Sequence, residues 1–356
     1  MYAQSKKEVP RSQTILTISS AQTHDLKTTL VGQIARALAV FCIDEIVIFD
    51  DGHSHTGGRN EHLDPRKQQL MAQDEANGYT AFSNPNDFFY HVLSYLETPP
   101  HLRRALFPFH PNLKTASALP SLDMPHHLRT EEWCQYREGV TLEPQRKSSE
   151  YGNSKRRKNF EDDPEDSETY VNAGLPNPVK VNAAIPPNTR VTLCFDQDGP
   201  AEQLTAQAVS PDTPREEAGY YWGYVPRLAS SLSTVFTECP YDGGYDYTIG
   251  TSERGIPVQQ LLKPIRHSTP DADGSDGSTT IPDWQHLLVV FGGVAGLEVA
   301  LQNDKDLKGK VSQASELFDA WVNLVQGQGS RTIRTEEAVW IGLTALKELV
   351  DWRAEA

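Results

Sequence analysis

The chain has 356 residues, 38% of them hydrophobic, and a formal net charge of −15 at pH 7. This length suits two domains with hydrophobic cores, and the charge argues against a nucleic-acid binder that is basic over its whole surface. No run approaches the roughly 18 continuous apolar residues that cross a bilayer, and Met1–Pro10 lacks the apolar core of a signal peptide. We expect a soluble intracellular protein with no membrane segment.

Cysteine and histidine spacing gives no support for a disulfide framework or a metal site. The chain has no CxxC pair and no HExxH motif, and its four cysteines are far apart: Cys42, Cys134, Cys194 and Cys239. His53 and His55 stand close together, but in a polar stretch where surface histidines are the commoner case. We expect reduced thiols and no metal.

The N-terminal segments predict a strand, a helix and a second strand. The strands are expected at 14–20 (TILTISS) and 45–49 (EIVIF), the latter a β-branched run typical of a buried strand. Residues 27–41 predict the helix, with its apolar positions on one face: Leu30, Ile34, Leu38 and Phe41. Arg36 is expected on the other side. This βαβ spacing predicts a parallel sheet.

The next segments predict a long polar loop at 51–81 and a helix at 86–97, with Phe89, Val92 and Leu96 on one side. From 131 to 218 the chain has many prolines, a mixed-charge segment at 147–168 and no good amphipathic helix. Its short β-like runs are Gly139–Leu142, Val179–Asn182 and Arg190–Phe195. We expect a small β domain inserted into an α/β domain.

The α/β pattern returns after 218. We expect a helix at 224–236, then three strands at 245–249, 286–291 and 320–325, and a polar loop at 269–280. A final helix is expected from Thr335, as a candidate N-cap, to Trp352. Its apolar stripe comprises Ala338, Ile341, Ala345, Leu349 and Trp352.

Three glycine-containing loops follow these last strands: Thr248–Gly255 (TIGTSERG), Phe291–Glu298 (FGGVAGLE) and Gln326–Thr335 (QGQGSRTIRT). In open α/β sheets, ligands bind beyond the carboxyl ends of the strands, and glycine lets the backbone approach them closely. Together the loops predict one pocket for a nucleotide-like ligand. Each loop alone is more often a simple turn. The chain lacks the P-loop, dinucleotide-binding and serine-hydrolase motifs.

Several segments together resemble one family. In chain order they are Gly32–Ala37 (GQIARA), Pro125–Arg129 (PHHLR), Arg137–Gly139 (REG), Tyr221–Tyr224 (YWGY), Ile249–Gly255 (IGTSERG), Phe291–Gly293 (FGG) and Gly327–Ala338 (GQGSRTIRTEEA). With these, from about Thr14 to Leu349, the chain resembles the SPOUT-class RNA methyltransferases that carry an inserted β domain. Insertions at 51–81, 147–168 and 269–280 depart from the family outside its motifs.

The resemblance implies a fold that spacing does not predict. It is an α/β sheet whose C-terminal part is tied in a deep trefoil knot, with an inserted OB-like β-barrel and assembly as a homodimer. The implied domain bounds are 12–130 and 219–356 for the two parts of the knotted domain, and 131–218 for the barrel.

The resemblance also implies S-adenosyl-L-methionine as methyl donor, bound in the knot, and RNA as the acceptor. The cofactor-binding residues are then expected to be Thr251, Arg254, Gly292, Gly293, Glu298, Asn323, Gln326, Gly327, Gln328, Gly329, Ser330 and Thr332. Of these, Glu298 is expected to accept a hydrogen bond from a ribose hydroxyl of the cofactor. Its alternative is a solvated carboxylate at a helix start.

Two arginines are expected to be catalytic, Arg36 and Arg254. Arg36 is expected to meet the reacting base, and Arg254 either to face the RNA or to pair with the methionine carboxylate of the cofactor. If the acceptor is uridine N3, a proton leaves first, and a cation stabilises the anion that forms. Each arginine has a structural alternative, an ion pair or a surface site. The substrate side is expected to include His127, Arg129 and Arg334, although a turn after Pro125 explains His127 equally well.

Aromatic and basic residues leave further choices open. Trp222 with the tyrosines at 220, 221 and 224 suits base stacking, but burial in a domain interface is the commoner role. Basic clusters at Arg103–Arg104 and at Lys155–Lys158 (KRRK) leave room for a confined RNA site or a nuclear signal. The expected location is nuclear, nucleolar or cytoplasmic.

The function predicted is methylation of a base in ribosomal RNA. Uridine N3 is one acceptor that fits, and the sequence leaves the target nucleotide and the acceptor atom open. Two alternatives remain from the sequence. One is a SPOUT-fold module that binds RNA or protein with little catalysis, and the other is a SPOUT-type protein methyltransferase.

Overall fold

A computed structural model describes residues 11–16, 23–52, 69, 76, 78, 80–143, 168–197, 199, 204–267, 281–293 and 296–355. The expected loop at 51–81 falls mostly outside the described residues, as do nearly all of 147–168 and 269–280. The described chain forms two compact units. We call Thr98–Pro108 with Met124–Trp222 the barrel unit, and the other described residues the sheet unit.

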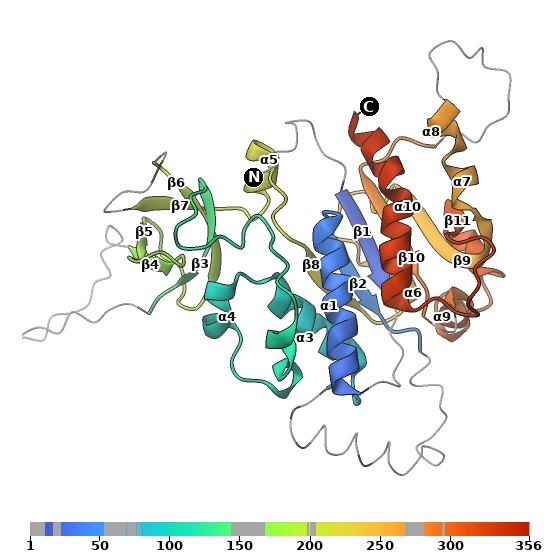
Figure 1. The fold of residues 1–356 in the computed structure, drawn as a ribbon, viewed down its shortest axis with the longest axis horizontal. Helices are drawn as coiled ribbons and strands as arrows, with labels where there is room; N and C mark the ends of the chain where they lie inside the picture. Colours follow the sequence, from blue (N-terminus) through green and yellow to red (C-terminus); the bar gives the residue numbers. More distant parts are fainter. Residues whose placement is uncertain are drawn as a thin grey trace, which may run out of the picture. The chain divides into compact units, whose positions relative to one another are not determined.

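The sheet unit is built on a six-stranded sheet in the order β11-β9-β10-β1-β2-β8 (Figure 1). Its strands are β1 (Arg11–Leu16), β2 (Glu45–Phe49), β8 (Val225–Ala229), β9 (Tyr247–Pro257), β10 (His286–Phe291) and β11 (Ala320–Asn323). Every pairing between neighbours is parallel, as the sequence predicts. All carboxyl ends therefore meet at one edge, where α/β sheets bind ligands.

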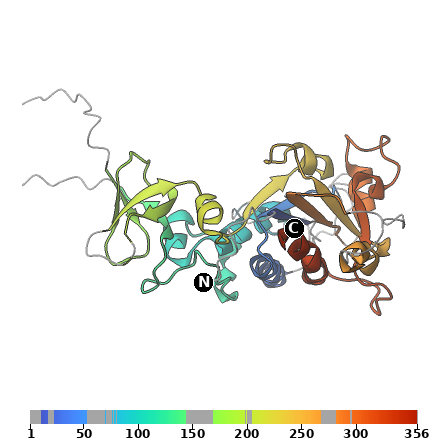
Figure 2. The same ribbon diagram turned by 90° about the horizontal axis from the view of Figure 1, so that it is seen from above.

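Helices cover both faces of this sheet. On one face α1 (His24–Val40) and α10 (Thr335–Glu355) lie side by side, and α3 (Pro85–Glu97) lies next to α1 (Figure 1, Figure 2). On the other face α6 (Leu232–Thr237), α9 (Leu297–Asn303) and the 3-10 turn η3 (Ala314–Leu317) share an apolar core with β2, β8 and β10. Shorter elements complete the unit: η1 (Pro111–Leu113), η2 (Ala116–Ala118), α7 (Val258–Leu261) and α8 (Lys263–His267).

The barrel unit contains a closed barrel with the strand order β3-β4-β5-β7-β6. The strands are β3 (Tyr136–Thr141), β4 (Thr169–Asn172), β5 (Val179–Val181), β6 (Arg190–Phe195) and β7 (Thr205–Val209), and the helices are α4 (Pro100–Leu106) and α5 (Thr213–Ala218). Apolar side chains fill it: Val171, Ala173, Val179, Val181, Leu193, Phe195 and Ala206. Glycine is needed at 139, because a Cβ there would lie 2.3 Å from Cγ1 of Val171.

Contiguous apolar runs predicted their strands best. β2 and β10 occupy the expected residues 45–49 and 286–291, and α3 begins one residue before its expected start. The first strand begins earlier than expected, at Arg11 rather than 14. In α1, Ile34 and Leu38 are buried as expected.

The helix expected at 224–236 is wrong. The segment forms β8, which pairs with β2 at the edge of the sheet, and then α6. Pro226 is tolerated in an edge strand, because its missing N–H removes little from the ladder. Ser231 ends the strand and starts the helix with a capping box, its hydroxyl accepting from the Thr234 N–H while the Thr234 hydroxyl accepts from the Ser231 N–H.

The final helix has the expected position but a different buried face. Of the expected stripe only Leu349 is buried, whereas Ala338, Ile341, Ala345 and Trp352 are partly exposed. The buried face is centred on Gly342, where a Cβ would lie 2.6 Å from the Phe291 ring. The rest of this face is apolar, since Val339, Leu343, Leu346 and Leu349 are buried as well. The expected stripe was therefore displaced by one residue from the buried face at 338, 341 and 345.

The start of α10 is also corrected by one residue. The carbonyl of Arg334 accepts from Ala338 N–H, and the carboxylate of Glu337 accepts from Arg334 N–H at 2.9 Å. Arg334 is therefore the N-cap, and Thr335 is the first helical residue.

Candidate functional site

The three glycine-containing segments meet at the carboxyl ends of β9, β10 and β11. They enclose a cavity of about 370 Å³, which we call the glycine-rich pocket. It is lined by Thr251, Ser252, Glu253, Arg254, Gly292, Gly293, Gly296, Glu298, Asn323, Leu324, Val325, Gln328, Arg331, Thr332, Ile333 and Ala338. The expectation of one shared pocket is confirmed in its geometry.

The first segment is part of a strand, which corrects the expected loop at 248–255. β9 continues to Pro257, but its pairing with β11 is interrupted. Trp321 lies opposite Gly250 and Val322 lies opposite Ile256, so residues 251–255 bulge out between two paired positions. A bulge of this kind aims its side chains away from the ladder, and here they line the pocket.

Close contacts fix both ends of this bulge. A Cβ on Gly250 would lie 2.5 Å from the Trp321 ring, and a Cβ on Gly255 would lie 2.5 Å from the Val322 carbonyl carbon. Neither distance is tolerated by a side chain, so both positions require glycine. The two glycines of IGTSERG are therefore required by the backbone conformation at the two ends of the bulge, rather than by direct contact with a ligand.

Two expected cofactor residues also hold the wall in place. The Thr251 hydroxyl donates to the Val290 carbonyl at 3.0 Å. The Asn323 amide donates to the Glu253 carbonyl at 2.8 Å and accepts from Val325 N–H at 3.0 Å. Both side chains line the pocket, but their polar atoms are engaged in joining its segments.

The second segment follows β10 directly. A Cβ on Gly292 would lie 3.0 Å from the Leu297 nitrogen, so the backbone is drawn tightly back into α9. Gly296 has a positive φ of 79° and its N–H donates to the Gly293 carbonyl at 3.0 Å. Gly292 and Gly293 thus present bare backbone to the cavity, which suits a ligand that needs close approach.

The third segment contributes fewer of its expected residues. Gln328 and Thr332 line the pocket, whereas Gln326, Gly327, Gly329 and Ser330 are absent from its lining. Internal hydrogen bonds shape the segment, since the Gln328 amide donates to the Ser330 carbonyl and the Ser330 hydroxyl to the Thr332 carbonyl. Arg331, which the sequence did not single out as a ligand, does line the pocket.

Arg254 and Glu298 carry opposite charges across the pocket rim. Their closest atoms, Nη1 and Oε1, are 3.6 Å apart, and the side chains are 75% and 35% exposed. Such an exposed pair contributes about 0–1 kcal/mol to stability, so either group is available to a ligand.

Arg36 is not brought to this pocket. Its Nη1 donates to the carbonyls of Ser121 and Leu122, at 3.2 Å and 2.6 Å. The guanidinium thus links α1 to the segment that follows η2. This is a structural role, which is the alternative to catalysis that the sequence leaves open for Arg36. Within one chain, the glycine-rich pocket contains Arg254 and Arg331 but not Arg36.

The expected substrate residues are divided between the units. His127 and Arg129 belong to the barrel unit, where the His127 ring meets His126 edge-on at 4.5 Å and the Arg129 carbonyl accepts from the Arg137 guanidinium. Arg334 is exposed at the start of α10 in the sheet unit, close in sequence to Arg331 of the pocket lining.

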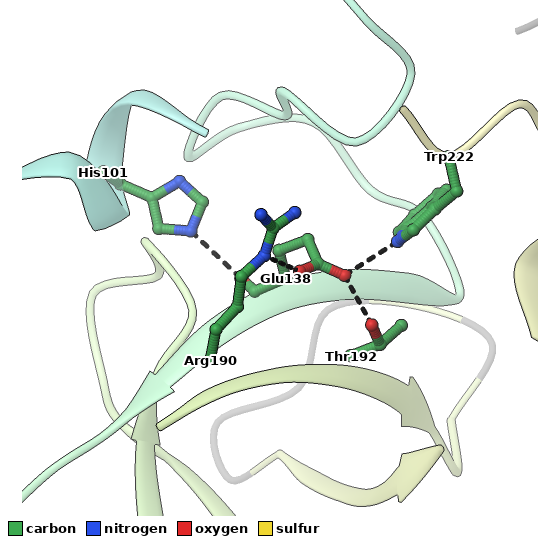
Figure 3. Close-up of polar contacts among 5 residues, drawn as sticks. All are labelled: His101, Glu138, Arg190, Thr192 and Trp222. Atoms are coloured by element: carbon green, nitrogen blue, oxygen red, sulfur yellow. Dashed lines mark hydrogen bonds and ion pairs between the residues drawn. The ribbon is translucent and has the colours of Figure 1, made fainter. Parts of the chain in front are cut away.

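A buried carboxylate that the sequence analysis missed organises the barrel unit. Glu138, 2% exposed, accepts from Arg190 Nε at 2.6 Å, the Thr192 hydroxyl at 2.6 Å and Trp222 Nε1 at 2.7 Å (Figure 3). Its carbonyl lies 3.0 Å from Nε2 of His101. Trp222 is therefore a buried structural side chain, not a platform for stacking bases.

The neighbouring Arg137 is equally buried, at 1% exposure, and its guanidinium donates to four backbone carbonyls: Leu128, Arg129, Glu132 and Ala173. The REG motif and Trp222 of the YWGY motif therefore stabilise the barrel unit, whereas Tyr224 belongs to the sheet unit, where its hydroxyl donates to the Leu93 carbonyl at 3.1 Å. A charged pair inside an otherwise apolar strand was the signal that could have revealed this network.

A second buried carboxylate lies in the sheet unit. Glu45, 3% exposed, accepts from Arg227 Nε at 2.7 Å and from the Tyr245 hydroxyl at 2.8 Å. Burial, together with the Glu45 charge, holds the pKa of Tyr245 well above its usual value. This network joins β2 to β8 and to the segment before β9.

Within the described residues, no group of three or more His, Cys, Asp or Glu side chains is arranged to hold a metal, and the four cysteines form no disulfide. No helix among them is long and apolar enough to span a membrane.

Comparison with known proteins identifies the family. A family model described as "Putative RNA methyltransferase" matches residues 11–346. The chain is 39% identical over 332 residues to 28S rRNA (uridine-N(3))-methyltransferases of Homo sapiens and Mus musculus, covering 93% of this chain and 75% and 73% of those proteins. It is 39% identical to the Drosophila melanogaster protein of the same name, of which it covers 60%. The chain belongs to this family of RNA methyltransferases and is itself a methyltransferase.

Proposed function

We propose that the protein transfers a methyl group from S-adenosyl-L-methionine to N3 of a uridine in ribosomal RNA. The observation that carries the proposal is the match over 93% of the chain to proteins named for this reaction. The glycine-rich pocket adds a chemical reason, since it lies where open α/β sheets bind nucleotide-like ligands.

The residues of the pocket fit the cofactor. Bare backbone at Gly292 and Gly293 suits the close approach of a nucleoside, and the rim offers a carboxylate on Glu298 and guanidiniums on Arg254 and Arg331. S-adenosylmethionine carries ribose hydroxyls, an ammonium and a carboxylate, which these groups complement. When bound, it supplies an electrophilic methyl group. The chain has only to position the acceptor in line with that group.

Proton loss from N3 leaves negative charge on the base, which a nearby guanidinium stabilises. Arg254 is the candidate that the pocket itself contains. Arg36 does not line the pocket. We therefore assign Arg36 a role at the base only if a second subunit of a homodimer brings it there.

The finer fold is part of the same proposal. We place a SPOUT-type trefoil knot in the C-terminal part of the sheet domain and assign residues 12–130 and 219–356 to that domain. Of these residues, 98–108, 124–130 and 219–222 pack with the barrel unit. Residues 131–218 are assigned to an OB-like insert, which the closed five-stranded barrel supports. A nuclear or nucleolar site would fit an enzyme of ribosomal RNA, and KRRK at 155–158 is the candidate signal.

The test is methyl transfer from labelled S-adenosylmethionine to ribosomal RNA that lacks the modification. Label at N3 of a uridine, mapped by mass spectrometry, is the expected outcome. Bound cofactor with no transfer to RNA would leave a binding module instead. Label in protein but not in RNA would indicate the protein methyltransferase alternative.

A further inference from the structure

A second cavity adjoins the glycine-rich pocket. It has a volume of about 420 Å³ and lies between α9, η3 and the start of β11; we call it the α9 pocket. Arg254 and Glu298 line both cavities, so their side chains form the shared wall. Because this ion pair is long and exposed, it opens at little cost when a ligand takes either partner.

The lining of the α9 pocket suits one nucleotide. Gln302 and Gln313 supply amides, and Ser312 supplies a hydroxyl, all of which both donate and accept hydrogen bonds. Trp321 provides an apolar floor, held in place by stacking on Phe318 at 5.6 Å. Mixed donors and acceptors around an aromatic surface are what recognition of an unpaired RNA base requires.

A lysine-bearing loop borders this pocket. Lys305, Lys308 and Lys310 are all exposed between α9 and η3, and Lys308 lines the cavity. One exposed carboxylate, Asp306, lies among them. In a chain with a net charge of −15, such a cluster beside a pocket is a local site for a polyanion.

The loop is held in shape by a buried carboxylate. Asp304, 3% exposed, accepts from the N–H groups of Asp306 at 2.8 Å, Leu307 at 3.2 Å and Ser233 at 2.7 Å. The lysines therefore stand on a preorganised backbone, so that little ordering entropy opposes a contact with RNA.

Another cavity at this edge of the sheet has the opposite charge. It lies at the ends of β2 and β8, and its charged lining residues are all acidic: Asp50, Asp51, Asp87 and Glu238. Repulsion keeps a phosphate backbone away from that end of the edge. This difference in charge favours the α9 pocket over the acidic cavity as the place where an RNA strand binds.

We propose that the α9 pocket binds the RNA nucleotide next to the one that is methylated, with its phosphate on the lysine loop. The inference rests on the proposed function for the identity of the RNA. It adds a binding site in which Arg254 and Glu298 separate the methyl donor from the neighbouring nucleotide.

The test compares two variants with matched controls, using the full chain and a ribosomal RNA fragment that contains the target uridine without its methyl group. Lys308→Glu is compared with Lys114→Glu, an exposed lysine of the same unit that is remote in sequence. Ser312→Trp, which fills the pocket from an exposed position, is compared with Ser312→Ala. RNA affinity is measured by fluorescence anisotropy over a range of salt concentrations, and cofactor affinity by calorimetry.

Lys308→Glu and Ser312→Trp are expected to weaken RNA binding roughly tenfold or more, while both controls and all cofactor affinities stay within about twofold. Lys308→Gln is expected to lower the salt slope of binding by about 0.7–0.9. RNA affinities equal to those of the controls, in variants that unfold at the wild-type temperature, would overturn the inference. RNA binding that depends on Lys308 without methyl transfer would overturn the proposed function and leave this site standing.

Discussion

Glutamates meet arginines in two very different settings in this protein. In the barrel unit, Glu138 is buried and accepts from three side chains of the same unit (Figure 3). At the pocket rim, Glu298 has one distant cation and is 35% exposed. Removing one partner of a buried pair costs about 3–5 kcal/mol, whereas an exposed pair contributes about 0–1 kcal/mol. The buried network specifies a fold, and the exposed pair leaves its charges for a ligand.

The largest effect is expected at Glu138. Replacing it in Glu138→Ala leaves Arg190, Thr192 and Trp222 without their shared acceptor and should cost about 3–5 kcal/mol of unfolding free energy. Chemical denaturation followed by Trp fluorescence measures it. Glu131→Ala, an exposed carboxylate of the same unit, is the control. A loss of unfolding free energy below about 1 kcal/mol would mean that the buried Glu138 contributes no more to stability than the exposed Glu298.

A variant of Asp304 tests how much stability a buried carboxylate gains from hydrogen-bond donors that are mostly backbone N–H groups. Burial opposes its ionisation, but the N–H groups of Ser233, Asp306 and Leu307, together with the Ser233 side chain, outweigh burial and hold the pKa of Asp304 below its usual value. Its contribution is therefore complete above the unfolded pKa of about 3.9 and is lost as pH falls through the lower native pKa. Asp304→Asn should cost about 2 kcal/mol at pH 6. That cost should shrink below about pH 4, and a cost independent of pH would contradict the assignment.

A smaller loss is expected in the sheet unit. Tyr245→Phe removes one of the two side-chain donors to Glu45 but leaves Arg227 in place, so we expect a cost of about 1–2 kcal/mol. Tyr90→Phe is the control, because Tyr90 is 40% exposed. Thermal unfolding of the two variants should differ by several degrees. Equal stabilities would mean that Arg227 alone satisfies the buried carboxylate.

The smallest change in stability is expected at the rim, where the change in binding is expected instead. Glu298→Gln should alter the unfolding free energy by less than about 1 kcal/mol, yet weaken S-adenosylmethionine binding by about tenfold through loss of a charged acceptor. Glu348→Gln breaks another exposed pair, that with Arg266 at 2.7 Å, and should leave cofactor binding unchanged. Calorimetry separates the two, and equal cofactor affinities would argue against a ligand contact at Glu298.

Local patterns were enough where the structure depends on neighbours in sequence. The runs at 45–49 and 286–291 became β2 and β10 because all of their side chains are buried except that of the half-buried His286. The segment 224–236 failed because its apolar residues suit a helix as well as an edge strand, and only pairing with β2 decides between them. Gly342 was missed for a similar reason, since it makes its contact by lacking a side chain.

The pocket was predicted because a parallel sheet brings the ends of separate strands together whatever their spacing in sequence. The buried hydrogen-bond networks were not predicted. Glu138 and Trp222 are 84 residues apart, and the sequence around either residue does not indicate that it contacts the other. The α9 pocket was missed as well. Its wall depends on where Arg254 meets Glu298, which only the bulge in β9 decides.

The bulge divides β9 into two rigid ends and a flexible middle. Residues 247–250 and 256–257 are held in register by neighbouring strands, whereas 251–255 have no residue of β11 opposite them. Backbone amides in the bulge should therefore exchange with deuterium far faster than those on either side. A ligand that fills the glycine-rich pocket would slow exchange at these positions and in the other two segments that line the pocket, but not in the paired ends of β9. β9 is therefore fixed in the sheet at both ends of a short flexible segment. This segment can adjust its conformation to a ligand without disrupting the strand pairing of the sheet.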